Sequence, residues 1–158
     1  MALCKIVSGG QTGVDRGALD AALALNFPCG GWCPEGRRAE DGAIPERYPV
    51  DELPGGGYRQ RTERNVIDSD ATLVLFLREL SGGTLETVRF CATHAKPVLT
   101  LDAGTTAPLQ AACQAQAFIA RHGIAVLNVA GPRESGWIGA RQYAAQVIAE
   151  LIPRRASA

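Results

Sequence analysis

The sequence predicts an α/β fold, namely one Rossmann-like three-layer α/β/α domain with a mostly parallel sheet of about five strands. Short apolar runs alternate along the chain with segments of helical periodicity, which is typical of right-handed βαβ units. Residues 71–77 form an almost uninterrupted apolar run, as expected for a strand buried on both faces of a parallel sheet. Glycine clusters follow several of these runs, where a strand would turn into a helix.

The expected elements follow in order along the chain. Strands are predicted at 3–7, 29–32, 71–77, 97–101 and 124–129. Helices are predicted from about Val14 to Leu25, and at 58–67, 106–122 and 137–152, with a further helix opened by residues 81–84. Thr12 is the expected N-cap of the first helix, and Asp15 is its capping-box acid.

Residues 33–57 interrupt this alternation, because their prolines and glycines prevent a long helix. A connection of this length is usually functional or disordered. Tyr48, the adjoining Tyr58 and the mixed charges favour an ordered loop with a mobile Pro-Gly-Gly-Gly tip at 54–57.

Composition narrows the function classes. A chain of 158 residues with 46% hydrophobic and 20% charged residues suits a single domain over residues 1–158. The formal net charge of +0 disfavours nucleic acid as a partner. No segment approaches the ~18 apolar residues of a membrane span, and five scattered cysteines are typical of free thiols, so a cytoplasmic location is expected. Cys29 and Cys33 lack a second pair, and no metal site is predicted.

Four strand ends carry polar or glycine-rich sequence, at 8–10, 81–84, 102–104 and 128–133. Parallel strands end at the same edge of a sheet, and ligands bind there, where the strand order reverses. Ser8-Gly9-Gly10-Gln11-Thr12-Gly13 opens a helix, so its amides would face an anion, with Gln11 and Thr12 adding donors. It lacks the G-K-[ST] of a P-loop and the first glycine of the dinucleotide-binding motif G-x-G-x-x-G. A simple tight turn is the alternative. Ser81-Gly82-Gly83-Thr84 is a second turn of this kind.

Charged side chains extend this candidate site. Arg37 and Arg38 would clamp phosphate, while Glu40 and Asp41 would bond hydroxyl or amino groups or hold Mg²⁺; the alternative is a solvated or internally paired loop. Arg133 would reach an anion across the rim. Arg61 and Asn65 share a helix face, turned to the site or to solvent. The candidate binding residues are Ser8, Gly9, Gly10, Gln11, Thr12, Gly13, Arg37, Arg38, Arg61, Asn65, Ser81, Gly82, Gly83, Thr84, Asn128, Gly131 and Arg133.

These motifs together resemble the family named "putative molybdenum cofactor carrier". The resemblance is carried by SGGQTGVDRGALDAAL (8–23), GWCPEGRRAEDGAIPERYP (31–49), RTERNVIDSDATLVL (61–75), SGGT (81–84) and NVAGPRES (128–135). That family is placed in the SLOG group of Rossmann-like proteins, with the lysine-decarboxylase-like phosphoribohydrolases. The resemblance implies a nucleotide- or cofactor-sized anion site at the glycine turns. The phosphoribohydrolase motif P-G-G-x-G-T-x-x-E is shortened here, and Glu86 is displaced relative to Thr84.

Three functions remain open from the sequence. The favoured hypothesis is a non-catalytic carrier of a phosphorylated ligand, either the molybdenum cofactor (molybdopterin) or a nucleotide. The first alternative is a hydrolase of nucleotide or phosphoribosyl N-glycosidic bonds, with Glu86, Glu40 or Asp41 as the catalytic carboxylate. The second alternative is a nucleotide-sensing interaction module. A homo-oligomer is compatible with all three.

Overall fold

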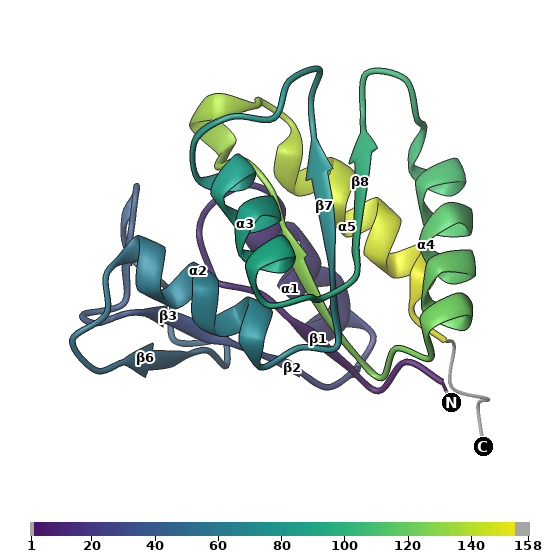
Figure 1. Cartoon of the computed structure of the whole chain (residues 1–158). Helices are drawn as coiled ribbons and strands as arrows, with labels where there is room; N and C mark the ends of the chain where they lie inside the picture. Colours follow the sequence, from purple (N-terminus) through teal and green to yellow (C-terminus); the bar gives the residue numbers. More distant parts are fainter. Residues whose placement is uncertain (1, 154–158) are drawn as a thin grey trace.

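The computed structural model describes residues 2–153, which form a five-stranded parallel sheet between two layers of helices (Figure 1). The strand order is β2-β1-β9-β7-β8. These strands span Lys5–Val7 (β1), Cys29–Gly30 (β2), Ala71–Phe76 (β7), Val98–Asp102 (β8) and Val126–Ala130 (β9). The predicted Rossmann-like three-layer α/β/α fold is therefore confirmed.

Helices cover both faces of this sheet (Figure 1). Helices α1 (Val14–Ala24), α4 (Pro108–His122) and α5 (Ala140–Leu151) lie together on the first face, and the short 3-10 helix η1 (Glu134–Gly136) precedes α5. Helices α2 (Tyr58–Ile67) and α3 (Gly82–Thr93) lie on the second. Within residues 2–153, no helix has the length and apolar character that crossing a membrane requires.

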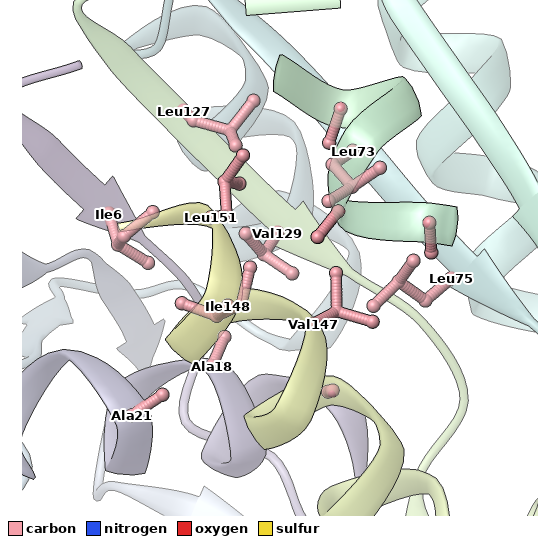
Figure 2. Close-up of a cluster of buried hydrophobic side chains, with 14 of the residues drawn as sticks. Ile6, Ala18, Ala21, Leu73, Leu75, Leu127, Val129, Val147, Ile148 and Leu151 are labelled. Carbon is pink, nitrogen blue, oxygen red and sulfur yellow. The ribbon is translucent and has the colours of Figure 1, made fainter. Parts of the chain in front are cut away.

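The main core lies between the sheet and helices α1, α4 and α5. Figure 2 shows side chains of the sheet facing α1 and α5: Ile6, Leu73, Leu75, Leu127 and Val129 against Ala18, Ala21, Val147, Ile148 and Leu151. Gly17 permits the close approach of α1 to α5, because a Cβ there would lie 2.2 Å from the Arg141 carbonyl oxygen. The small residues Gly17, Ala18 and Ala21 thus let α1 pack closely against its neighbours.

The predicted strand at 29–32 is in fact two strands in different sheets. Gly31 separates them with a φ of 139°, a region that favours glycine, and a Cβ there would lie 2.1 Å from the Ser8 carbonyl oxygen. After this bend β3 (Trp32–Pro34) pairs in parallel with β6 (Asp51–Leu53).

The rest of the 33–57 segment is also structured. Strands β4 (Arg38–Ala39) and β5 (Gly42–Ala43) form a small antiparallel pair. A separate apolar cluster lies beneath them, made of Leu19, Cys33, Ala39, Ile44, Tyr48 and Val50. Arg37 holds the segment from inside, because its guanidinium donates to the backbone carbonyls of residues 44, 45, 48 and 50.

The sheet order places a switch point at its centre. The unit β1-α1-β2 extends towards one edge and the unit β7-α3-β8 towards the other, with β9 between β1 and β7. The loops that leave β1 and β7 therefore diverge, and a crevice is expected above the carboxyl ends of β1, β9 and β7.

Candidate functional site

A cavity of about 750 Å³ lies at this switch point. Its walls come from the turn after β1, the loops after β7 and β9, one side of α2, the start of α3 and the region of η1. The end of β8 does not contribute. Asp102 there accepts hydrogen bonds from the amides of Arg78 and Gly104 instead. Three of the four polar strand ends predicted from the sequence thus line one cavity.

The first turn of α3 presents unpaired backbone amides to this cavity. Ser81 is the N-cap and makes no side-chain capping bond. In the described part of the chain, the amides of Gly82, Gly83 and Thr84 find no acceptor, while that of Leu85 donates to the Ser81 carbonyl. A Cβ at Gly82 or Gly83 would meet no atom within 4 Å. Free amides and the positive end of the helix dipole make this turn suited to an anion.

The turn between β1 and α1 is different, because the chain supplies acceptors to several of its amides. The Gln11 amide donates to Asp15 Oδ2 at 3.2 Å, and the Thr12 amide to Gln11 Oε1 at 3.0 Å. The Val14 amide donates to the Pro132 carbonyl. The amides of Gln11 and Thr12 are therefore not free for a phosphate, contrary to what the glycine pattern predicts.

The predicted capping of α1 by Thr12 is wrong. Gly13 is the N-cap, and no side chain caps the helix. The Thr12 hydroxyl instead donates to Glu40 of the 33–57 segment. Gly13 itself packs against backbone, since a Cβ there would lie 2.4 Å from the Pro132 carbonyl oxygen.

Two buried charges, Asp15 and Arg61, lie at the base of the cavity. Burial raises the pKa of the Asp15 carboxyl above its ordinary value, and the Arg61 guanidinium opposes this shift. Burial likewise lowers the pKa of Arg61, opposed by Asp15. Arg61 Nη1 donates to the Gly9 carbonyl at 2.7 Å, so α2 is fixed against the turn after β1.

Three amide side chains also line the cavity. Asn65 pairs with both backbone groups of Trp32, at 2.8 and 3.0 Å, and Asn128 Nδ2 donates to the Thr72 hydroxyl at 3.2 Å. Gln11 Oε1 accepts from the amides of Thr12 and Glu40. Gln11 Nε2, however, is buried without a partner from Ala2 to Pro153. A buried donor of this kind is costly, and a ligand acceptor would satisfy it.

Arginines surround one aromatic ring at the edge of the cavity. The guanidinium carbons of Arg61 and Arg133 each lie 5.6 Å from the centroid of the Tyr58 ring, and that of Arg38 lies 6.0 Å away. Arg133 is exposed, and no carboxylate within residues 2–153 forms an ion pair with it.

The acidic candidates differ in position. Hydrogen bonds from Ser135 and Thr12 lower the pKa of Glu40, which joins η1 and the turn after β1 to the 33–57 segment. The hydrogen bond from the Arg16 guanidinium lowers the pKa of Asp41 in a bidentate pair. Glu86 alone of the three lines the cavity, and Arg59 pairs with it at 2.7 Å.

The structure therefore brings together most, but not all, of the predicted residues. Those that line the cavity are Gly9, Gln11, Arg61, Asn65, Ser81, Gly82, Gly83, Thr84, Glu86, Asn128, Gly131 and Arg133. Those that do not are Ser8, Gly10, Thr12, Gly13, Arg37, Arg38, Glu40 and Asp41. The described residues contain no group of three His, Cys, Asp or Glu side chains that could hold a metal ion.

Asp15, Tyr58 and Arg59 line the cavity although the sequence did not indicate them as ligand-binding residues. Asp15 has the pattern of an ordinary first-turn helix acid. Tyr58 and Arg59 precede Arg61 at the start of α2. This closeness to a candidate arginine is the sequence signal that could have pointed to them.

Comparisons with known proteins agree with this architecture. Residues 6–152 match the model of the circularly permutated YpsA SLOG family. The crystal structure of a protein titled "putative molybdenum carrier protein", from Syntrophus aciditrophicus SB, is 41% identical and superposes with a TM-score of 0.93, covering 96% of each chain. No curated protein matches.

Proposed function

The chain belongs to the circularly permutated YpsA SLOG family, and on that premise we propose that it binds and carries a small phosphorylated ligand in the cavity above β1, β9 and β7. The observation that carries the proposal is the open first turn of α3, where three consecutive amides face the cavity without an acceptor in residues 2–153. The ligand's phosphate would bind these amides, and Arg133 would neutralise its charge.

The molybdenum cofactor is the cargo we favour, and a nucleotide is the other. The similar protein from Syntrophus aciditrophicus SB is titled as a molybdenum carrier. A cavity of about 750 Å³ lies within the usual range for small ligands of roughly 300–1,000 Å³. The phosphate of molybdopterin suits the amides of α3, and the unpartnered Gln11 Nε2 would donate to a carbonyl of the pterin. A cytoplasmic protein with free thiols fits this role.

A thermal-shift and calorimetry series tests the proposal. Molybdopterin, nucleotides and inorganic phosphate are titrated into the whole protein. At about 100 times Kd, a bound ligand adds about 2.7 kcal/mol, which should raise Tm by several degrees. Arg133→Gln should weaken binding of the phosphorylated ligands, whereas Arg121→Gln, at the exposed end of α4, should not. If none of these ligands raises Tm, the proposal fails.

One observation favours a second function, N-glycosidic hydrolysis. Glu86 lines the cavity beside the proposed phosphate site, and Arg59 holds its carboxylate. A carboxylate in that position would stabilise the developing positive charge on a sugar during cleavage. Incubation with nucleoside monophosphates and chromatography of the free base separates the functions: release of base that Glu86→Gln abolishes means catalysis, and stable retention of the nucleotide means carriage.

A further inference from the structure

A group of positive charges lies beside the α3 amides of the proposed phosphate site and shares Arg133 with that site. It consists of Arg38, Arg61 and Arg133, whose guanidinium carbons all lie within 6.0 Å of the centroid of the Tyr58 ring; we call it the Tyr58 arginine cluster. Its members come from β4, α2 and the loop after β9. Three distant parts of the chain thus bring like charges to one ring.

The protein supplies little negative charge to this cluster. None of the three arginines forms an ion pair with a carboxylate in the described part of the chain. The buried Asp15 acts on Arg61, and Glu40 interacts with Arg133 at longer range, but neither forms an ion pair with the cluster. Arg38 donates only to the Glu35 carbonyl, and Arg61 Nη2 has no partner among residues 2–153. Several arginines elsewhere in the described chain do pair with a carboxylate, as Arg16 does with Asp41 and Arg141 with Asp20.

Like charges held together without counter-charge repel one another, and an anion relieves that repulsion. Guanidinium groups are also the side chains best matched to phosphate oxygens, which they bond through planar pairs of donors. The Tyr58 ring offers its face to these cations and orders them at the mouth of the cavity, since Tyr58, Arg61 and Arg133 all line it.

We propose that the ligand of this protein carries two anionic groups, as in a diphosphate. The first binds the amides of α3, and the second binds the Tyr58 arginine cluster. This inference rests on the proposed function and narrows it from phosphorylated ligands in general to diphosphates. A variant of Arg38 distinguishes the second anion site from the first, because Arg38 belongs to the Tyr58 arginine cluster but does not line the cavity at the α3 amides.

Calorimetry with inorganic phosphate and pyrophosphate tests the inference on the whole protein. Pyrophosphate should bind more tightly than phosphate, and Arg38→Gln should weaken pyrophosphate by about fivefold, while phosphate changes less than twofold. Arg121→Gln is the matched control, because it removes an exposed charge on α4. It should leave both affinities unchanged.

A second pair of variants tests the role of the ring. Tyr58→Phe keeps the aromatic face and should retain the preference for pyrophosphate, whereas Tyr58→Leu should reduce it. Equal weakening of both ions by Arg38→Gln, or an equal effect of Arg121→Gln, overturns the inference and leaves the proposed function standing. Absence of binding by either ion at millimolar concentration overturns both.

Discussion

Gly83 offers a substitution that should make the protein more stable and unable to bind its ligand. The residue occupies the second position of α3 with a φ outside the left-handed region, and a Cβ there meets no atom within 4 Å. Gly83→Asp therefore introduces no clash. Its carboxylate would lie beside the free amides of the first turn, in the position proposed for the ligand's phosphate.

The stability gain follows from two effects. A carboxylate in the first turn of a helix contributes about 0.3–1 kcal/mol through the helix dipole, and aspartate replaces glycine with a gain of about 0.3 kcal/mol in helix propensity. The free energy of unfolding should rise by about 1 kcal/mol, and Tm by roughly 2–4 °C. Phosphate binding should fall by at least about tenfold, since the new charge repels the ligand and occupies its donors.

Urea denaturation and calorimetry measure the two quantities on the same sample. Gly83→Asn is the control, because it adds a side chain of the same size without a charge. It should gain little stability and retain more binding than Gly83→Asp. Undiminished phosphate affinity in Gly83→Asp would refute the assignment of the phosphate to the α3 amides. A loss of stability would refute the view that this turn is open.

Two further predictions concern the turn after β1 and the segment that covers it. Gly13→Ala should lower the free energy of unfolding by about 3 kcal/mol or more in urea, because its Cβ would meet the Pro132 carbonyl and its φ is 82°. Glu40 has a pKa below its ordinary value of 4.5, so its contribution to stability is present above that value and is lost as the pH falls through the lowered pKa. Glu40→Gln should therefore flatten the acid dependence of hydrogen exchange in residues 33–57; an unchanged profile would show that the bonds to Ser135 and Thr12 do not hold this segment.

The sheet and helices were predictable because their signals are local. The apolar composition of residues 71–77 predicts a buried strand, and the structure has β7 at Ala71–Phe76. Helix α2 has the predicted bounds, 58–67. The break at Gly31 was not predictable, since residues 29–32 are consistent with a single short strand. Its cause is the approach of the Ser8 carbonyl from another strand, which no local pattern contains.

Parts of the candidate site were predictable from local sequence, and other parts depend on contacts between distant residues. The open turn at 81–84 follows from a glycine-rich sequence between a strand and a helix, which is a local feature. The turn at 8–13 has the same appearance, but Asp15 and Pro132 fill it. Whether an internal carboxylate or a ligand accepts from these amides depends on the direction of the Asp15 side chain. The position of an acid in the first turn of a helix does not reveal that direction. The sequence likewise suggested Arg37 as a phosphate-binding residue, but its guanidinium donates to backbone carbonyls of the 33–57 segment.

The carboxylate of Asp15 gives the turn after β1 a resident substitute for a bound anion. In a turn whose amides are free, such as the first turn of α3, the acceptor comes from the ligand. Here the Gln11 amide has its acceptor at all times. If the protein is the carrier proposed above, the floor of the cavity is already ordered without ligand, and loading and unloading would involve little rearrangement of this part of the protein.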